Sequence, residues 1–314
     1  MSLHRLTEIT IGVPNVDETI GYYTEFGLTP LGTDPDTREH LFGTVDGGQQ
    51  LRIVHRPLRQ LLSLGIGVDD PDDLARIASS LKGLNIDADI TTSDTQLSTV
   101  EPVTKTAVTI SIAPRLVQEA TPTPGYNSPG IVERANHRAF WQDRTDGVRP
   151  RKLGHVVIGS ADVEGSQRFY TEGLGLKISD TAPGLATFLR CSADHHNLLL
   201  QNAPVNFLHH TAWEVDDIDE IGRGAKAMLD GHPERHVWGF GRHWVGSNFF
   251  YYLRDPAGNF TEYYSDMDEI LDDQLWEPGV FDIADLTRIQ DWGPSLPPSM
   301  LAPDDLAELM AGSH

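Results

Sequence analysis

The sequence predicts an α+β protein made of two homologous domains followed by a C-terminal extension. Its 314 residues allow two domains of ordinary size. The segment LTEITIGVPNVDETIGYYTE, which begins at Leu6, aligns with LGHVVIGSADVEGSQRFYTE, which begins at Leu153, and seven of the twenty positions are identical. The same offset of 147 residues places Val68–Asp70 on Val215–Asp217, about sixty residues farther on. One offset held over this length indicates a duplicated domain.

Each domain is predicted to be a pair of βαβββ modules, because a strand, a polar turn, a helix and further strands occur twice in each repeat. In the second domain, Ser160–Asp162 offers oxygens that can cap a helix, and Gly173–Gly175 ends that helix. The expected strands of this domain are 155–159, 186–190, 196–201, 209–215, 248–253 and 260–264, and its expected helices are 163–172 and 218–229.

The Pro/Gly-rich stretch TPTPGYNSPG separates the two repeats and indicates a linker. Two tryptophans in the last segment, Trp276 and Trp292, predict that this segment packs on the body and can serve as a lid. The predicted organisation is a first domain over 1–135, a linker over 136–150, a second domain over 151–270 and a C-terminal tail over 271–314.

The composition argues against nucleic acid or a membrane surface as a partner. The chain has 24 Lys and Arg against 46 Asp and Glu, a formal net charge of −22, and such a surface repels phosphate groups. No stretch approaches the roughly 20 apolar residues that span a bilayer, and the N-terminus lacks a signal-peptide core. The only cysteine, Cys191, cannot form an internal disulfide, so we expect a reducing cytoplasm.

Three residues of metal-ligand type occur together in the second domain and are absent together from the first. They are His155 in the first strand, His210 in the strand that starts the second module, and Glu262 in the last strand. At the matching positions the first domain has Glu8 and Ser63, and no suitably placed carboxylate in 115–118.

Two imidazoles and one carboxylate form the facial triad of mononuclear non-haem Fe(II) oxygenases, which leaves three positions of an octahedron open. A single strand histidine is more often a partly buried structural residue, and a single strand glutamate usually faces solvent. Their joint occurrence in one repeat, with His155 and His210 at equivalent positions of two modules, favours a metal site. The first domain is correspondingly expected to bind no metal.

Four further residues are expected on the same face of the second domain. They are His196, His243, Asn248 and Tyr252. Taken alone, a loop histidine is as easily exposed to water, and a strand tyrosine as easily has an interfacial hydroxyl. Because alternation along a strand directs only one residue of a tandem pair inward, either His195 or His196 lies in the pocket, and His196 is favoured since it leads the strand NLLLQ.

The second domain resembles the metal-bearing domain of type I extradiol catechol dioxygenases, in the vicinal oxygen chelate superfamily. The stretches that carry the resemblance are LGHVVIGSADVEGSQRFYTEGLGLKI, DHHNLLLQ, FLHHTAWEVDDID and GRHWVGSNFFYYLRDPAGNFTEYYSD. The last is the most specific, because it combines the GRH loop, the tyrosine strand, the DPxG turn and the glutamate in register. The family also has a metal-free N-terminal domain of the same architecture, so the resemblance covers nearly the whole chain.

The resemblance implies a role for each candidate residue. His155, His210 and Glu262 would bind Fe(II), or in some members Mn(II). His196 would be the acid/base histidine, and His243 and Tyr252 would hydrogen-bond a catecholate, with Asn248 as a further substrate contact. The implied reaction inserts both atoms of O2 into a substituted catechol and gives a yellow muconic semialdehyde-type product, and the implied assembly is a homo-oligomer, tetrameric or larger.

The resemblance says less about the residues that would contact the catechol ring and its substituent than about the metal ligands. Family members often carry a polar residue two positions after the first ligand, where this chain has Val157. Arginines that could bind a carboxylated ring substituent are Arg242, Arg254 and Arg288. Four aromatic residues could form a wall around the ring, although at least two are expected in the core: Trp244, Phe249, Phe250 and Tyr251.

Two other functions are compatible with this fold. A glyoxalase-like lyase or isomerase of the same superfamily commonly holds its metal with four protein ligands, and the sequence offers no fourth ligand in register. A sequestering or drug-binding module would need a cleft but no metal triad. The coincidence of the triad with His196, His243 and Tyr252 favours the dioxygenase over both.

Overall fold

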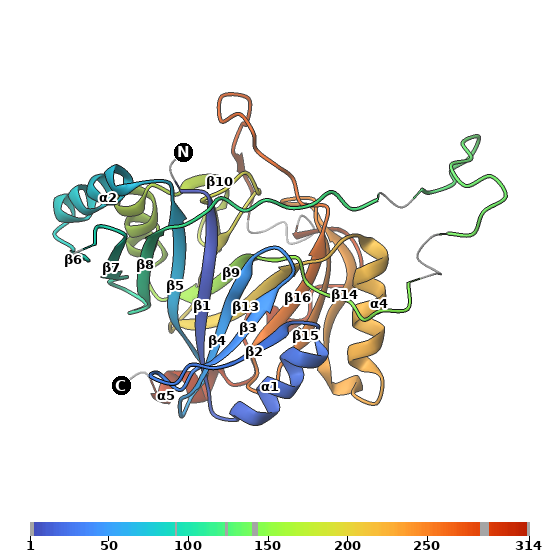
Figure 1. The fold of residues 1–314 in the computed structure, drawn as a ribbon, viewed down its shortest axis with the longest axis horizontal. Coiled ribbons are helices and arrows are strands. Elements are labelled where there is room, and N and C mark those ends of the chain that lie inside the picture. The colour runs from blue at the N-terminus through green and yellow to red at the C-terminus, as the bar shows by residue number, and fades with distance from the viewer. Residues whose placement is uncertain (1–2, 92, 123–124, 140–143, 283–288, 313–314) are drawn as a thin grey trace.

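The computed structural model describes residues 3–91, 93–122, 125–139, 144–282 and 289–312. Figure 1 shows two mixed β-sheets with a small number of helices packed beside them. This arrangement confirms the predicted α+β class. Within the described residues, no helix is both long enough and apolar enough to cross a membrane.

The first sheet has eight strands in the order β2-β3-β4-β1-β5-β8-β7-β6. Each half of the sheet is one βαβββ module, and the first strands of the two modules, β1 and β5, pair antiparallel at the centre. The elements are β1 Arg5–Val13, α1 Val16–Glu25, β2 Thr29–Thr33, β3 His40–Thr44, β4 Gly48–His55, β5 Gln60–Val68, α2 Pro71–Gly83, β6 Ala88–Ile90, β7 Gln96–Val100 and β8 Ala107–Ile112.

The second sheet has ten strands in the order β17-β10-β11-β12-β9-β13-β16-β15-β14-β18. Its eight inner strands repeat the layout of the first sheet, and the tail adds one strand at each edge. The elements are β9 Lys152–Ser160, α3 Val163–Arg168, a π-helical turn Phe169–Leu174, β10 Lys177–Ala182, β11 Ala186–Arg190, β12 Leu198–Asn202, β13 Phe207–Glu214, α4 Ile218–Leu229, a 3₁₀ turn Pro233–Arg235, β14 His236–His243, β15 Phe249–Arg254, β16 Phe260–Ser265, β17 Gly279–Val280, β18 Gln290–Trp292, a 3₁₀ turn Pro298–Met300 and α5 Leu306–Gly312.

The strand register of the two sheets repeats the sequence offset. Ile9 pairs with Leu64 at the centre of the first sheet, and Val156 pairs with Thr211 at the centre of the second. Both members of the second pair lie 147 residues after those of the first. The duplication therefore extends to the hydrogen-bond ladder that places the central side chains.

The local chemistry of the second domain explains where its helices begin and end. The carboxylate of Asp217 accepts hydrogen bonds from the amides of Asp219 and Glu220 and caps α4, which has the predicted bounds. Asp162 caps α3 through the amide of Gly165. The predicted helix over 163–172 is α-helical only as far as Arg168 and continues as a π-helical turn over Phe169–Leu174, two residues beyond the predicted end. Gly175, with a φ of 91°, ends it in the left-handed conformation that favours glycine.

The two halves of the chain share an apolar core. Directly after α1, the Phe26 ring stacks on the Tyr263 ring of β16 with centroids 3.9 Å apart, and the Tyr263 hydroxyl donates to the Phe26 carbonyl over 2.7 Å. The Tyr22 hydroxyl lies 2.5 Å from the Thr261 hydroxyl of the same strand. The predicted domain boundaries at residues 135 and 151 stay a prediction. In the chain, the strands of the first sheet come before residue 135 and those of the second sheet come after residue 151.

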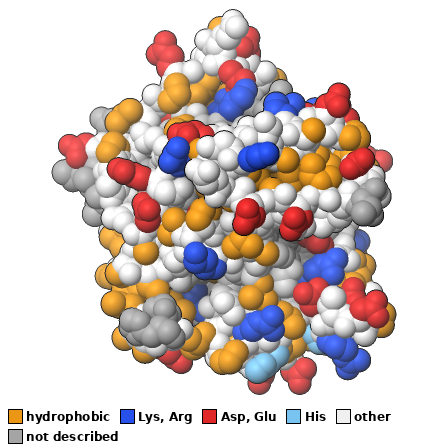
Figure 2. Space-filling view, turned by 90° about the vertical axis from the view of Figure 1, so that its left-hand side faces the viewer, with side chains coloured by type: hydrophobic (Ala, Val, Ile, Leu, Met, Phe, Trp, Pro, Cys, Tyr) orange, Lys and Arg blue, Asp and Glu red, His pale blue; other side chains and the backbone are white. Residues whose placement is uncertain are grey.

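The C-terminal tail packs on the second sheet. Its strand β17 pairs with β10, and its strand β18 pairs with β14. The Trp276 indole donates to the Ser179 carbonyl over 2.9 Å, whereas Trp292 is 43% exposed. Figure 2 shows acidic, basic and apolar side chains interspersed on one face of the molecule, so the strong net charge does not gather into a single acidic patch on that face.

Candidate metal centre

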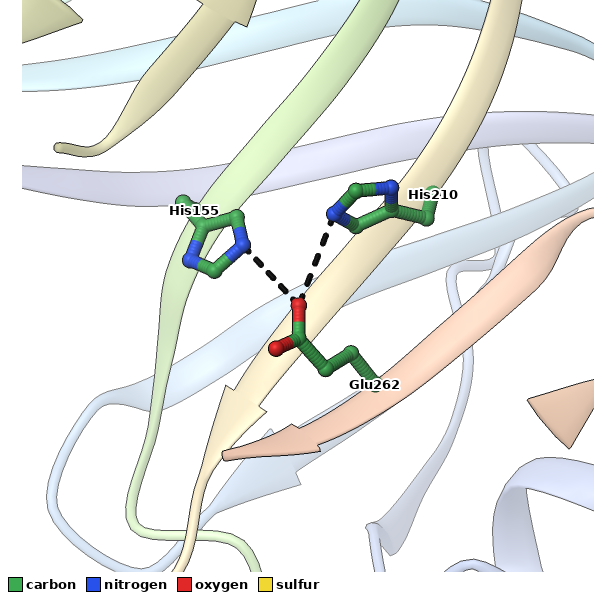
Figure 3. A group of neighbouring side chains, drawn as sticks. All are labelled: His155, His210 and Glu262. Carbon is green, nitrogen blue, oxygen red and sulfur yellow. Dashed lines mark hydrogen bonds and ion pairs between the residues drawn. The ribbon is translucent and has the colours of Figure 1, made fainter. Parts of the chain in front are cut away.

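Three neighbouring strands of the second sheet bring His155, His210 and Glu262 together. In the ladder β9-β13-β16, His155 and Glu262 both pair with Ala212 of the central strand, one from each side. His210 lies two residues before Ala212, and residues two apart on a strand share a face. All three side chains therefore project from the same face, and Figure 3 shows them converging.

The ligand atoms of these three residues lie within 4.8 Å of one another. The Glu262 Oε2 is 3.1 Å from the His155 Nε2 and 3.5 Å from the His210 Nε2. All three side chains are buried, and the His210 Nε2 has no hydrogen-bond partner in the described structure. Two imidazole nitrogens and a carboxylate oxygen at these separations fit a divalent transition metal that accepts nitrogen and oxygen ligands.

Burial and mutual attraction set the protonation of this cluster. Burial would raise the pKa of Glu262, but the neighbouring His155 and His210 outweigh that effect and lower the pKa below its usual range. Burial lowers the pKa of His210 to about 4, against the opposing attraction of Glu262. A neutral imidazole beside an ionised carboxylate is the state that binds a metal ion.

The tautomer of His210 follows from its neighbour His209. The His209 Nε2 lies 2.8 Å from the Met300 carbonyl, to which it must donate, so in neutral His209 the Nδ1 is an acceptor. The His209 Nδ1 lies 2.6 Å from the His210 Nδ1, which therefore carries the hydrogen. This chain of two bonds leaves the His210 Nε2 with its lone pair toward Glu262, as a metal ligand requires.

The metal-free protein is expected to lose stability on acidification. Burial lowers the pKa of His209 to about 3 and that of His210 to about 4, so the folded state binds fewer protons than the unfolded state below about pH 6.5. The stabilisation is complete above that pH and is lost as the pH falls, by roughly 3 kcal/mol for His210 alone. Urea unfolding measured between pH 7 and 4 checks this slope.

The variant His209→Gln is the control for this measurement. Burial raises the pKa of the Asp255 carboxyl to about 6, which contributes the opposite slope in the acidic range. Since His209→Gln leaves Asp255 and His210 in place, the difference between the pH slopes of the two proteins reports the contribution of His209. Equal slopes in wild type and variant would contradict the expected histidine contribution.

A cavity opens over the three ligands and is lined mainly by apolar side chains. Its polar wall holds His196, His243 and Tyr252, which the sequence predicted on this face. The other lining residues are Val157, Ala182, Leu185, Ala186, Phe188, Leu199, Gln201, His209, Trp238, Val245, Phe281, Asp282, Ile289, Leu296, Met300 and Leu301, together with His155 and His210. The described tail thus forms a large part of the cavity wall, which is compatible with the lid interpretation.

His243 and Tyr252 form a hydrogen-bonded pair on this wall. The His243 Nδ1 donates to the Ile289 carbonyl of the tail over 3.0 Å, so the Nε2 of the neutral ring accepts from the Tyr252 hydroxyl, also at 3.0 Å. Burial lowers the pKa of His243 and raises that of Tyr252 well above its usual value. The single hydrogen of the Tyr252 hydroxyl is thus given to His243, and the tyrosine would have to exchange this bond in order to donate to a bound oxygen.

Residues 152–263 match the model of the Glyoxalase/Bleomycin resistance protein/Dioxygenase superfamily. The match covers most of the second sheet. Metapyrocatechase 2 of Cupriavidus necator is 36% identical over 181 residues, which cover 56% of this chain and 55% of the relative. A 3-methylcatechol 2,3-dioxygenase of Pseudomonas putida is 32% identical over 121 residues, which cover 35% of this chain and 40% of the relative. The chain thus spans about half the length of the curated relatives that it matches.

The whole chain has the fold of the superfamily. The Mn(II)-bound glyoxalase from Novosphingobium aromaticivorans superposes with a TM-score of 0.74, covering 96% of this chain and 94% of that chain at 22% sequence identity. At this identity the likeness concerns the fold, which it extends from the second sheet to the first. The predicted vicinal oxygen chelate fold is confirmed.

Among the described residues of the first domain, no equivalent triad is found. Glu8, at the position of His155, binds Arg52 at 2.9 Å and accepts from the Gln49 amide at 2.8 Å. Ser63 lies at the position of His210. The counterpart of Glu262 was predicted in 115–118, and this is wrong. Glu262 pairs with Ala212 in the second sheet, and Gly65, the residue 147 positions before Ala212, pairs with Thr109 in the first. Thr109 is therefore the structural counterpart of Glu262, six residues before the position that the offset gives.

Asn248 does not line the cavity, contrary to the expected substrate contact. Its side chain is fully buried, and its amide donates to the Glu262 Oε1 over 3.1 Å. It thus orients the ligand carboxylate from behind. On β9, a Cβ at Gly154 would lie 1.8 Å from the Tyr264 hydroxyl, so glycine at this position lets the tyrosine ring pack beside His155.

The expected aromatic wall and carboxylate-binding arginines are not in the cavity. None of Trp244, Phe249, Phe250 and Tyr251 lines it, and the aromatic wall consists instead of Phe188, Trp238, Tyr252 and Phe281. Arg242 pairs with Asp266, and Arg254 pairs with Asp304, and neither arginine is among the lining residues. Arg288 lies outside the described residues.

The structure shows which histidine of the tandem pair His195-His196 faces the cavity. His196 lines the cavity with its ring centroid 4.3 Å from that of His155, whereas His195 is fully buried behind it. His196 precedes β12 rather than lying within it, since the strand begins at Leu198. Sequence reasoning missed Gln201, which alternation along β12 from Leu199 could have indicated.

Proposed function

We propose that this protein is an extradiol ring-cleaving dioxygenase, which inserts both atoms of O2 into a substituted catechol and gives a muconic semialdehyde-type product in the catabolism of aromatic compounds. The observation that carries the proposal is the convergence of His155, His210 and Glu262 beneath a cavity whose polar wall is His196, His243 and Tyr252. The similarity to relatives named metapyrocatechase and 3-methylcatechol 2,3-dioxygenase supports it.

The residues present fit Fe(II), with Mn(II) as the alternative. The Nε2 atoms of His155 and His210 and the Glu262 carboxylate would hold the ion. When bound, such an ion lowers the pKa of a coordinated hydroxyl and holds two reactants in one place. Asn248 keeps the carboxylate in position through its amide.

The surrounding residues would handle the substrate and its protons. Burial lowers the pKa of His196 well below the usual value, so the free ring is neutral. A neutral ring beside the cavity has a lone pair that can take a proton from a catechol hydroxyl and return it later. The Tyr252 hydroxyl can donate to the catecholate oxygen when its hydrogen turns from the His243 Nε2 to the substrate. The apolar remainder of the wall excludes water, which strengthens these polar contacts.

The lining indicates a catechol with a neutral, apolar ring substituent. Among the described residues that line the cavity, none is a lysine or an arginine, and the one carboxyl group besides the ligand is that of Asp282. A carboxylated side chain would lose its hydration there without gaining a cationic partner. Alkyl or aryl substituents would bury their surface against Phe188, Leu199 and Trp238.

A glyoxalase-like lyase is the alternative within the same superfamily. In the described residues, three side chains make up the ligand cluster, and no fourth lies within the same distance. The further imidazole of His243 has its Nε2 at 3.9 Å from the Glu262 Oε1 and is engaged with Tyr252. This arrangement favours the dioxygenase.

The test is reconstitution with Fe(II) in the absence of air, followed by a panel of substituted catechols and then oxygen. We expect a yellow product and one O2 consumed per catechol, with 3-alkyl and 3-aryl catechols turned over faster than carboxylated ones. A parallel reconstitution with Mn(II) decides between the metals. Tight metal binding without oxygen uptake from any catechol would contradict the proposal, and thiol adducts of oxoaldehydes would then be tested.

We further propose that the protein is cytoplasmic and forms a homo-oligomer, a tetramer or larger. The family resemblance supports the assembly, and the single buried Cys191 suits a reducing compartment. We propose catechol and O2 as its ligands, and neither nucleic acid nor a membrane as a partner, in view of the net charge of −22. Sedimentation velocity at micromolar concentration tests the oligomer, and a monomer would contradict it.

A further inference from the structure

Two tandem histidine pairs of the second domain have the same hydrogen-bond arrangement. In His209-His210, the outer ring donates through Nε2 to a fixed acceptor and receives a hydrogen bond through Nδ1 from the inner ring. The result is an inner Nε2 that keeps its lone pair. The pair His195-His196 shows the same contacts with a different acceptor.

The acceptor behind His195 is the side chain of Asp180 on β10. The His195 Nε2 lies 2.9 Å from the Asp180 Oδ2, and the His195 Nδ1 lies 3.0 Å from the His196 Nδ1. An ionised carboxylate only accepts hydrogen bonds, so the His195 Nε2 carries the hydrogen. The Nδ1 of neutral His195 must then accept, and the His196 Nδ1 must donate.

This chain of bonds is buried and built from several elements. His195 is fully buried, and Asp180 is 5% exposed. The His195 ring packs between the rings of Phe188 and Trp276, with centroids 5.8 and 5.4 Å away. The second oxygen of Asp180, Oδ1, accepts from the Gly279 amide of β17 over 2.6 Å. The tail thus holds one carboxylate oxygen of Asp180, and His195 holds the other.

We propose that Asp180 and His195 are positioning residues that hold His196 in one orientation and one tautomer, with Nδ1 protonated and Nε2 bare toward the cavity. The inference rests on the proposed function, because it gives His196 the form that accepts a proton from a catechol hydroxyl. When His196 accepts that proton through Nε2, its bond to His195 stays in place, so the ring keeps its orientation through the reaction.

The variant Asp180→Asn tests this role with an isosteric change. Since the Gly279 amide still needs an acceptor at Oδ1, the new amide nitrogen faces the His195 Nε2 and donates to it. His195 then carries its hydrogen on Nδ1, and His196 is expected to change to the Nε2-protonated tautomer. We expect kcat to fall at least tenfold, within the range of roughly 10–100-fold typical for residues that orient a site from behind, while KM changes little.

The tautomer is read separately from activity, by ¹⁵N NMR of histidine-labelled, full-length protein loaded with diamagnetic Zn(II). The signals of His195 and His196 are assigned with His195→Phe and His196→Phe. The matched control is Asp273→Asn, which removes the ion pairs of the tail with Lys177 and Arg190 beside the same strand but does not touch the chain of bonds. It is expected to leave both the tautomer and kcat unchanged.

Each outcome decides the inference. A change of the His196 tautomer with a loss of kcat in Asp180→Asn, absent from Asp273→Asn, supports it. An unchanged tautomer, an unchanged kcat, or an equal effect in the control overturns it. If Asp180→Asn fails to fold, His195→Phe keeps a ring between Phe188 and Trp276, and full activity in that variant overturns the inference. If wild type cleaves no catechol, the proposed function fails, and the NMR result still decides the tautomer.

Discussion

The variant Glu262→Gln is expected to lose its metal ion and more than 100-fold of its ring-cleaving activity. Residues that merely support a ligand cost roughly 10–100-fold when they are replaced, so loss of the ligand charge itself should exceed that range. The amide keeps the size and shape of the side chain but no longer offers an anionic oxygen to the ion. Two neutral imidazoles, His155 and His210, would remain as ligands.

The measurement is metal content after dialysis, alongside oxygen uptake with the best catechol of the panel. Glu214→Gln is the matched control, because Glu214 ends β13, the strand of His210, but pairs with Lys152 at 3.8 Å and receives the Gln118 amide at 2.6 Å instead of facing the cavity. The control should keep its metal and its activity. Retention of one equivalent of metal by Glu262→Gln would show that the site is not built on this carboxylate.

The sequence was sufficient for the fold because the duplication carries over to the strand ladder. A constant offset between repeats predicted equivalent central strands, and β1-β5 and β9-β13 pair in the same register. The offset failed after α2, where the connection to β8 is shorter than its counterpart before β16. The counterpart of Glu262 was therefore sought in 115–118 and lies at Thr109.

Site residues on neighbouring strands could be predicted from the sequence. Site residues whose position depends on the tail could not. His155, His210 and Glu262 lie on adjacent strands, so their residue types and the repeat sufficed to bring them together. Asn248 was misplaced because a polar residue at the start of a strand can serve a ligand from behind as well as a substrate from the front. The aromatic wall was misplaced because Phe281 comes from the tail, which has no repeat to indicate its path.

Asp180 illustrates a residue that sequence patterns cannot assign. It lies in an edge-side strand, 15 positions before His195, and no spacing rule connects the two. Only the packing of β10 against the loop before β12, with β17 alongside, brings its carboxylate to the histidine. The tandem histidines indicate in the sequence that a second ring lies behind the first. The acceptor that orients both rings, the Asp180 carboxylate, could be identified only from the structure.

The variant Arg59→Gln is expected to cost about 3 kcal/mol of the free energy of unfolding and to raise KM. Arg59 precedes β5 in the first sheet and is 4% exposed. Its guanidinium pairs with both carboxylate oxygens of Asp305, at 2.6 and 2.8 Å, and donates to the Leu208 carbonyl at 2.5 Å and to Asn259 at 3.2 Å. One buried cation thus connects the first sheet, the strand of His210 and the tail.

The loss would reach the cavity through the tail. Asp305 precedes α5, and five residues earlier the Met300 carbonyl accepts from His209, which orders His210. Without its arginine, the end of the tail loses its anchor to the body, and the wall that Leu296, Met300 and Leu301 form over the substrate becomes looser. A higher KM with a smaller change in kcat is the expected pattern.

The neighbouring ion pair provides the control for this prediction. Arg254 pairs with Asp304, the residue before Asp305, at 2.7 Å, but both side chains are substantially exposed. Exposed pairs contribute about 0–1 kcal/mol, so Arg254→Gln should leave unfolding and KM almost unchanged. Urea unfolding and steady-state kinetics of the two variants make the comparison. If both arginines behaved alike, the anchoring of the tail would not depend on the buried cation. The cavity wall would then be held by the other contacts of the tail, among them the hydrogen bonds of β17 and β18 and that of Met300 with His209.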